Sequence, residues 1–471
     1  MRGIISYGAY VPFNRLRREA IGAALGTSAG RGTRAVASFD EDSTTLAVEA
    51  GRLALRGAPD GAQPGVVLFA TAAPAYQDKN NASAIHAALD LPVGAPAYDA
   101  VGSARSGFGV LDAAAHDRRT VLALVSEVRT GLAGGADEAQ SGDAAAAFLV
   151  ADDTVGPVLA EHVGGAHASS EFLDRWRTPG ESHSKIWEER FSEAAYLPLV
   201  EDAVRRAYDS CGLTPSDVDR VVTAGLAARA VRGAAKFIGV APEKYADPLT
   251  DTVGNAGTAH AGLVLASVLD TAGPGELIMV VSLADGVDVA FFRTTDAITS
   301  FEPASTVAHQ IERGDDSLDY AKFLTWRRML TREPPRRPDP DRPAAPPSRR
   351  GERWKFGFYG SQCTECGARH LPPARVCVKC EAVDRMEPVR LADVGGTIAS
   401  YTIDRLAFSE SPPMVGTVVD FDGGGRFQIE MTDVDPDAVA IGGRVGMTFR
   451  RLFTTDGIHD YFWKARPAIE G

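Results

Sequence analysis

The chain has 471 residues, 45% of them hydrophobic and 24% charged, with a formal net charge of −13. This length exceeds one ordinary core and predicts two or three domains. The acidic balance disfavours nonspecific nucleic-acid binding, and no apolar run approaches the ~18 residues that span a bilayer. Because the N-terminus also lacks the long apolar core of a signal peptide, we expect a cytoplasmic protein without nucleic-acid or membrane partners.

Residues 1–298 alternate short β-rich runs with Ala-rich helical stretches. Runs that are apolar on both faces suit buried strands of a helix-covered sheet. The expected strands include 65–71, 120–126, 220–224 and 276–282, and the expected helices include 44–55, 199–211 and 259–269.

A weak internal repeat divides this region into halves, 1–165 and 166–298. Residues 102–111 resemble residues 254–263, and each segment is a small-residue turn that opens a helix. A strand, a Gly/Asp turn and another strand follow in both halves, ending in 142–150 and 285–293. The sequence therefore predicts a duplicated α/β unit.

Residues 299–330 form a predicted helical connector, because apolar residues recur at helical spacing in 316–330. Residues 331–352, TREPPRRPDPDRPAAPPSRRGE, are rich in proline and arginine. Proline removes backbone donors, so we expect an extended, solvated linker. Docking of its arginines on an acidic surface is the alternative.

Four of the five cysteines form two Cys-x-x-Cys knuckles separated by ten residues, Cys363/Cys366 and Cys377/Cys380. Four thiolates at this spacing suit one tetrahedral structural zinc in a ribbon over 353–388. Two disulfides or four free thiols are the alternatives, but disulfide frameworks are typical of small secreted domains.

Short β segments punctuated by Gly, Pro and Asp follow the ribbon, at 395–403, 413–420, 426–430 and 444–450. Four or five such strands within 389–471 suit a small barrel of the OB type. Such barrels often bind single-stranded nucleic acid in a basic groove. Here the strands carry acidic residues, among them Asp420, Asp422, Asp433 and Asp435, which disfavours that role.

A family resemblance covers nearly the whole chain. The large domain resembles the thiolase superfamily, in the branch of ketoacyl synthase III and HMG-CoA synthase, on 8–12, 40–43, the turn at Gly102, 142–146 and Gly254-Asn255. The tail resembles the zinc-ribbon plus OB-fold proteins that accompany such enzymes, on 363–380, Pro372-Pro373, 395–397 and Pro412-Pro413. The resemblance implies a duplicated five-layer α/β fold followed by a zinc ribbon and a small OB-type barrel.

The resembled enzymes hold an acyl group on a cysteine thiolate at a helix N-terminus, assisted by His with Asn or by Glu with His. The resemblance places the cysteine at Arg105, the His at Ala224 and the Glu near Ala72. Only the Asn is retained, at Asn255. The fifth cysteine, Cys211, lies at a predicted helix end and is interpreted as structural.

The candidate catalytic residues are therefore Asn255, Arg105, His260, Ser103, Ser106 and Tyr76. Arg105 would hold a carboxylate or phosphate, or polarise a carbonyl. Asn255 would orient a thioester carbonyl or a water. His260 lies one helical turn beyond Asn255, and a merely packed histidine is the alternative.

The remaining candidates have weaker signals. Ser103 or Ser106 would replace the nucleophile, although a hydroxyl needs an activating base and a serine that packs a tight turn is the simpler interpretation. Tyr76 would line the pocket or a dimer interface, with an ordinary surface loop as the alternative. The segment 171–192 could serve as a lid, an interface or a binding loop.

These residues lead to two functional hypotheses. The first is an enzyme acting on acyl-CoA or acyl-carrier thioesters, by carbon–carbon bond formation or cleavage of the aldol or retro-aldol type or by atypical acyl transfer, without a cysteine nucleophile. The second is a non-catalytic acyl-binding or scaffolding subunit that partners an active paralogue. Either would form a homodimer or a heterodimer, and the tail would help to complete the acyl channel.

Overall fold

The computed structural model describes residues 1–336, 338 and 340–468, and the chain divides into two compact units. The first unit consists of Met1–Ala37, Asp42–Ser83 and Pro92–Phe323, and the second of Ser38–Glu41, Ala84–Leu91 and Leu324–Gly471. Within the described ranges, every helix is too short or too polar to cross a membrane.

The first unit is built on a nine-stranded mixed sheet. Its strands follow the order β11–β12–β13–β8–β1–β7–β6–β4–β5. Their bounds are β1 Arg2–Tyr10, β4 Val66–Thr71, β5 Ala97–Val101, β6 Val121–Glu127, β7 Ala144–Asp152, β8 Ala160–Ala168, β11 Arg220–Gly225, β12 Leu277–Leu283 and β13 Val287–Thr294.

The two halves of this sheet repeat one pairing pattern. In the first half, β5, β4 and β6 are parallel neighbours, and β7 and β1 follow antiparallel. In the second half, a parallel bridge joins Tyr245 to Val221 on β11; β12 is parallel to β11, and β13 and β8 follow antiparallel. The duplicated α/β unit predicted from the sequence repeat is therefore confirmed.

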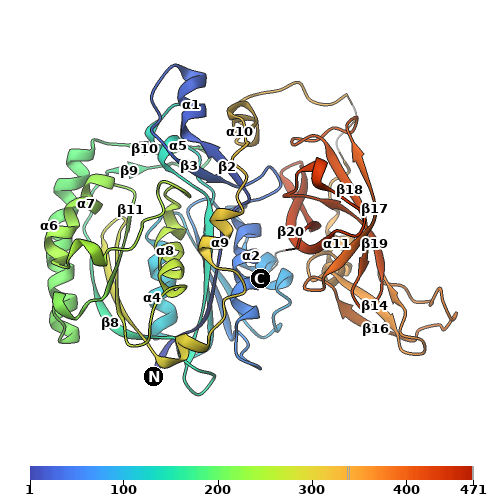
Figure 1. Ribbon diagram of the computed structural model, residues 1–471, viewed down its shortest axis with the longest axis horizontal. Helices are drawn as coiled ribbons and strands as arrows, with labels where there is room; N and C mark the ends of the chain where they lie inside the picture. Colours follow the sequence, from blue (N-terminus) through green and yellow to red (C-terminus); the bar gives the residue numbers. More distant parts are fainter. Residues whose placement is uncertain (337, 339, 469–471) are drawn as a thin grey trace. The chain divides into compact units, whose positions relative to one another are not determined.

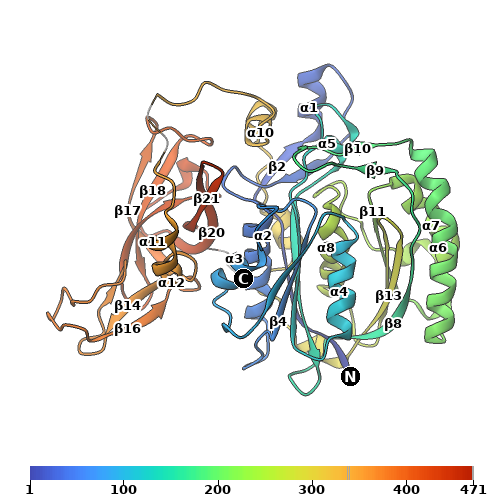
Figure 2. The same cartoon turned by 180° about the vertical axis from the view of Figure 1, so that it is seen from behind.

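Helices form the other layers of this unit (Figures 1 and 2). Helices α4 (Ser106–His116) and α8 (His260–Leu269) lie between the two halves of the sheet, α2 (Ser43–Arg56) covers the first half, and α6 (Glu189–Cys211) and α7 (Ala228–Ile238) cover the second. Asp42 caps α2 by accepting the Thr45 N–H at 3.0 Å. The five-layer fold is thus confirmed.

Shorter elements connect these layers. Helix α6 begins ten residues before the predicted start at 199 and contains Pro198, which is uncommon in a helix interior and masks this part of the helix in the sequence. The other elements of residues 1–330 are β2 Asn14–Arg17, α1 Arg18–Leu25, β3 Thr33–Val36, α3 Ala82–Ala88, α5 Ala136–Gln140, β9 Arg175–Trp176, β10 Lys185–Ile186, α9 Val307–Glu312 and α10 Tyr320–Trp326.

The second unit contains a three-stranded ribbon and a closed five-stranded barrel. The ribbon has the order β15–β14–β16, and the barrel closes in the order β17–β18–β19–β21–β20. The bounds are β14 Tyr359–Cys363, β15 Arg369–His370, β16 Met386–Arg390, β17 Gly396–Asp404, β18 Met414–Phe421, β19 Arg426–Met431, β20 Arg444–Thr455 and β21 Ile458–Pro467. The predicted OB-type barrel is confirmed.

The sequence pattern does not predict strand β21, because charged residues interrupt its apolar residues. One of them, Lys464, is buried, and its ammonium group lies 2.9 Å from Asp40 and 2.7 Å from Glu430, both in the same unit. A buried charge is tolerated when it is paired in this way. Its partner Asp40 is remote in sequence, so Lys464 gives the strand a polar signal although it lies in the core.

The Pro/Arg-rich segment departs from its prediction as an extended linker. Residues Ala345–Arg350 form helix α11 and Glu352–Lys355 form helix α12. Pro346 and Pro347 stand in the first turn of α11, where backbone N–H groups have no helical acceptor and proline is accepted. The prediction of an extended chain over 331–352 is wrong for this part; residues 337 and 339, and 469–471 of the barrel domain, lie outside the described residues.

Candidate functional site

Asn255 is held in a tight turn that leads into α8. Gly254 has φ +87°, and a Cβ there would collide with the Ser141 carbonyl oxygen, so the turn requires glycine. The Asn255 side chain accepts the Gly257 N–H through Oδ1 at 2.9 Å and donates through Nδ2 to the Gly225 carbonyl at 2.8 Å. The second Nδ2 hydrogen has no partner among the residues described, and it remains available to a ligand.

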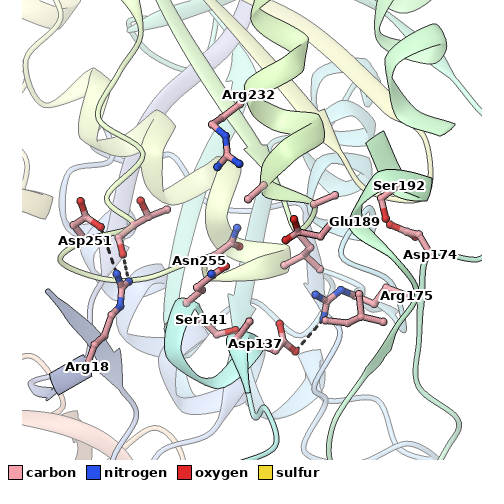
Figure 3. A pocket seen from close by; sticks show the side chains of 17 residues that line it. Arg18, Asp137, Ser141, Asp174, Arg175, Glu189, Ser192, Arg232, Asp251 and Asn255 are labelled. Atoms are coloured by element: carbon pink, nitrogen blue, oxygen red, sulfur yellow. Dashed lines mark hydrogen bonds and ion pairs between the residues drawn. The ribbon is translucent and has the colours of Figure 1, made fainter. Parts of the chain in front are cut away.

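Two adjoining cavities meet at Asn255. The first, here called the charged cavity, has a volume of about 320 Å³ and is lined by 17 residues, seven of them charged (Figure 3). The second, the Tyr245 cavity, has a volume of about 600 Å³. The residues that line both are Ala228, Arg232, Thr250 and Asn255. Both volumes lie in the range of small-molecule sites.

Three arginines line the charged cavity, and among the described residues only one of them has no ion pair or hydrogen bond. Arg18 pairs with Asp251 at 3.4 Å and donates to backbone carbonyls, and Arg175 pairs with Asp137 at 2.9 Å. Arg232 projects from α7 into the cavity on the side of Asn255 (Figure 3), and within the described part of the chain it has neither a hydrogen bond nor an ion pair. An exposed, unpaired guanidinium in a cavity wall is suited to an anionic group of a ligand.

Buried acids support this wall. Burial would raise the pKa of Asp137, but Arg129 and Arg175 hold it below its ordinary value, so this carboxylate stays charged. The pKa of Asp174 is raised by burial, although Ser192 hydrogen-bonds to it. Asp137 therefore engages both Arg129 and Arg175, which leaves Arg232 as the arginine of this wall without an ion pair among the described residues.

The Tyr245 cavity is lined mainly by apolar side chains from β11, α7 and the segment 240–248. Ala224, at the position where the resemblance places a histidine, is buried in its wall. Tyr245 and His260 are its two aromatic polar residues. The Tyr245 hydroxyl is buried and has no hydrogen-bond partner in the described structure.

His260 is 2% exposed and opens α8. Its Nδ1 accepts the Ala256 N–H at 3.3 Å, so the neutral ring carries its proton on Nε2. Burial, reinforced by the nearby charge of Arg129, lowers the pKa of His260 to about 4. At neutral pH this histidine is therefore a hydrogen-bond donor to the cavity rather than a cation.

Arg105 lies in a different environment. Its five N–H donors make five hydrogen bonds, two to Asp288 at 2.9 Å, and the others to Ser169, the Asp285 carbonyl and the Ala168 carbonyl. This guanidinium ties the start of α4 to β13 and to the end of β8. All of its donors are used, so it has none left for a ligand.

Ser103 and Ser106 share the environment of Arg105. A third cavity, of about 520 Å³ and here called the Arg105 cavity, is lined by all three residues together with His167 and three aspartates. The Ser103 hydroxyl accepts the Arg105 N–H at 3.1 Å and donates to Asp285. Ser103 is thus engaged as a cap of the turn.

The structure therefore separates the predicted residues into two groups. Asn255 and His260 share the Tyr245 cavity, whereas Arg105, Ser103 and Ser106 line the Arg105 cavity. Tyr76 lines none of these three cavities; its loop is held by Asn81, which accepts the Tyr76 N–H at 3.0 Å.

Two residues of the cavities, Arg232 and Tyr245, and one buried acid outside them, Glu127, carry no clear sequence signal. Arg232 and Tyr245 follow β11 in the chain. Arg232 lies near Asn255 because of the position of α7, and Tyr245 because of its one-residue parallel bridge to Val221. Glu127, at the end of β6, accepts the Ala72 N–H at 3.0 Å, next to the position where the resemblance places a glutamate. Burial raises the pKa of Glu127, opposed by Arg129.

The four clustered cysteines of the second unit are arranged to hold one metal ion. Their sulfur atoms lie within 4.8 Å of one another, with 3.6 Å between Cys363 and Cys380 and between Cys366 and Cys377. A tetrahedral zinc with Zn–S bonds near 2.3 Å sets sulfur atoms roughly 3.8 Å apart. The site fits zinc, and four thiolates leave no open coordination position for chemistry.

Three family profiles match the chain. Residues 208–291 match the C-terminal domain of 3-oxoacyl-[acyl-carrier-protein] synthase III. Residues 357–387 match the rubredoxin-like zinc ribbon domain of ChsH2, and residues 388–450 match the C-terminal OB-fold domain of ChsH2. The zinc ribbon and the barrel predicted from the cysteine spacing and the short strands are confirmed.

Curated relatives cover the large domain. The hydroxymethylglutaryl-CoA synthase of Archaeoglobus fulgidus is 31% identical over 357 residues, which span 70% of this chain and 99% of the relative. The enzyme of that name from Methanocaldococcus jannaschii is 29% identical over 354 residues, 70% of this chain and 99% of the relative.

Solved structures show the same fold. One described as HMG-CoA synthase complexed with CoA has a TM-score of 0.60 at 18% identity, covering 69% of this chain and 89% of that one. Another, MvaS in complex with 3-hydroxy-3-methylglutaryl coenzyme A, has a TM-score of 0.58 at 19% identity, covering 83% of this chain and 99% of that one.

Proposed function

The chain belongs to the hydroxymethylglutaryl-CoA synthase family, and we propose that it acts on acyl-CoA or acyl-carrier thioesters without a cysteine-bound intermediate. The reaction that fits is carbon–carbon bond formation or cleavage of the aldol or retro-aldol type, with atypical acyl transfer as the variant. The observation that carries the proposal is the place of Asn255, where a charged cavity meets a larger, mainly apolar one.

This arrangement matches the parts of a thioester. The phosphate-bearing arm would lie in the charged cavity, where Arg232 is free to bind an anion. The acyl group would lie in the Tyr245 cavity. The thioester carbonyl would then fall near Asn255, whose second Nδ2 hydrogen is unused.

The chemistry of an aldol or retro-aldol step requires a stabilised enolate oxygen. Donors that are already fixed in place provide such stabilisation without reorganisation. Asn255 is fixed by two hydrogen bonds, and neutral His260 presents an Nε2–H to the same cavity. Of the carboxylates in the charged cavity, Glu189 has neither an ion pair nor a side-chain hydrogen bond among the described residues, whereas Asp174 is hydrogen-bonded by Ser192; Glu189 is our candidate proton acceptor.

A cysteine nucleophile has no place in this proposal. No residue that lines the three cavities is a cysteine; four cysteines form the metal cluster, and Cys211 ends α6. Arginine at position 105 is a permanent cation and does not act as a nucleophile at cellular pH.

Mass spectrometry of a panel of acyl-CoA thioesters incubated with the purified protein tests the proposal. We expect consumption of at least one thioester, slowed by about 10- to 1,000-fold in Asn255→Ala, as for loss of an oxyanion donor. Cys211→Ser serves as the control and should keep the full rate. Turnover that survives in Asn255→Ala but disappears in Cys211→Ser would contradict the assignment.

A second function, an acyl-binding or scaffolding subunit beside an active paralogue, is favoured by the engagement of Arg105 and by an unpaired sheet edge. Strand β5 ends the nine-stranded sheet and exposes Tyr98 at 54% and Val101 at 44%. An unpaired edge is a template for pairing with another chain. We propose dimer formation there; an isolated homodimer that turns over substrate would exclude the scaffolding role.

A further inference from the structure

Three of the nine histidines of the chain gather at the wall of the Arg105 cavity and beside it. His167 lines that cavity together with Asp112, and His116 and His162 adjoin them. Imidazole and carboxylate groups are donors that zinc and the neighbouring divalent metals accept. The charged cavity, the Tyr245 cavity and the cysteine cluster use none of these residues.

One stripe of α4 faces the histidines of β8. Phe108, Asp112 and His116 recur at intervals of four residues, which places them on the same side of the helix. The Phe108 ring meets the ring of His167 edge-on at 6.1 Å, and the His116 ring meets that of His162 at 5.3 Å. The stripe therefore runs along β8 and brings Asp112 to the middle of the group.

A bulge in β8 turns both of its histidines to this side. His167 pairs with Asp288 on β13 and His162 pairs with Phe292, and β8 carries one extra residue, Val163, between the two pairs. Asp288 and Phe292 are four residues apart on β13, so their side chains share one face of the sheet. Residues paired across strands share a face too, so both histidines point the same way although five positions separate them. Bulges often re-aim side chains in this manner.

Asp112 lies at the distance of a fellow ligand from two imidazole nitrogens. Its Oδ1 is 3.5 Å from Nδ1 of His116 and 3.6 Å from Nε2 of His167. A tetrahedral zinc with bonds near 2.0 Å sets neighbouring nitrogen and oxygen ligands roughly 3.3 Å apart and the centroids of two bound imidazole rings roughly 5 Å apart. The 5.3 Å between the rings of His116 and His162 fits the second spacing.

His167 is already oriented as a metal ligand. Its Nδ1 donates to the carboxylate of Asp288 at 3.1 Å, so the neutral ring keeps its lone pair on Nε2, the atom that faces Asp112. Asp288 is itself only 6% exposed and is held by two hydrogen bonds from Arg105. A carboxylate that binds the far ring nitrogen is typical of histidines that coordinate metals.

We propose that Asp112, His116 and His167, with His162 as the fourth ligand, bind a divalent metal ion such as zinc. The side chains of His116 and His167 are 65% and 46% exposed, which leaves them room to close on one ion. Binding exchanges the 2.8 Å contact of His116 Nδ1 with the Asp112 carbonyl for a bond to the metal. The ion joins α4 to β8 beside the Arg105 cavity, and its binding is independent of the proposed thioester chemistry.

Equilibrium dialysis of the full-length protein against zinc, with the ribbon zinc already bound, tests the site when bound metal is counted by mass spectrometry. We expect a second zinc ion on each chain. His116→Ala and His167→Gln should each weaken its binding by at least about 10-fold, as for loss of a ligand or of its orienting partner. His183→Ala is the matched control and should leave binding unchanged, because His183 lies outside the cluster and its hydrogen bond is with the adjacent Ser182.

The variants and a second metal keep the test decisive. His116 is exposed on the surface of α4, so its substitution leaves the core intact. Cobalt at the second site should absorb without the thiolate-to-metal charge-transfer band that marks a cysteine site. Absence of a second ion at free zinc up to roughly 100 μM would overturn the proposal. Binding that persists in both ligand variants, that falls equally in His183→Ala, or that carries a thiolate band would overturn it as well.

Discussion

Arg105 and Arg232 both line cavities of the first unit, yet they differ in every contact. Arg105 donates five hydrogen bonds, to Asp288, Ser169 and two backbone carbonyls. Arg232 has no partner among the described residues. An arginine whose donors are all satisfied by the protein stabilises the fold, and one that is free in a cavity wall is available to a ligand. This difference places the proposed ligand site at Asn255, where the charged cavity meets the Tyr245 cavity, and not at the start of α4.

The largest effect should come from breaking the Arg105 contacts. In Arg105→Ala the carboxylate of Asp288, only 6% exposed, loses its bidentate partner. Removing one partner of a largely buried pair costs about 3 kcal/mol, so the free energy of unfolding in urea should fall by roughly this amount. The double variant Arg105→Ala/Asp288→Ala should recover part of the loss; an unchanged unfolding midpoint in the single variant would show that the contacts are dispensable.

The stability that the protein loses at low pH because of His260 should be nearly as large. Its pKa in the folded protein is about 4, below the ordinary 6.5 of an unfolded histidine. Between these values the unfolded chain binds the extra proton, so stability is lost as pH falls from 6.5 towards 4, by roughly 3 kcal/mol. Urea unfolding at pH 7 and pH 4.5 should show a smaller acid loss in His260→Asn than in the unaltered protein; equal losses would place His260 outside this linkage.

Arg232→Ala should give a smaller effect, and on binding rather than stability. Loss of one charge-assisted hydrogen bond to a phosphate weakens binding by about 10- to 100-fold, which titration with acyl-CoA measures. Lys236→Ala removes an equal charge one turn along α7, outside both cavities. Equal weakening by the two variants would indicate a general field effect instead of a contact.

The smallest expected effect is that of Tyr245→Phe on stability. Because its hydroxyl is buried and has no partner among the residues that the structure describes, its removal should leave the free energy of unfolding unchanged or raise it by up to about 1 kcal/mol. A loss of more than about 1 kcal/mol in urea unfolding would reveal a hydrogen bond of that hydroxyl within the folded protein.

The features that depend on local pattern are predictable from the sequence. The repeated halves, the buried strands and the cysteine knuckles follow from hydrophobic runs, turns and spacing. The position of Asn255 follows from the Gly-Asn turn, where a positive φ requires Gly254. These signals lie within a few residues of one another and need no tertiary context.

The remaining features depend on partners distant in the chain. The side chain of Arg105 is directed by Asp288, 183 positions away, which no spacing rule reveals. Tyr245 reaches the site through a single bridged residue, too short for a strand pattern. In the proline-rich segment, α11 forms because its prolines fall in the first turn of the helix, a coincidence that composition does not reveal.

Photolabelling with an acyl-CoA that carries a diazirine at the end of its chain tests most directly where the acyl group lies. After irradiation, peptide mapping by mass spectrometry identifies the labelled segment. The account predicts label between residues 223 and 260, around Tyr245 and His260, and its loss when unlabelled acyl-CoA competes. Competable label confined to the walls of the Arg105 cavity, in residues 103–112 and 285–288, would contradict it.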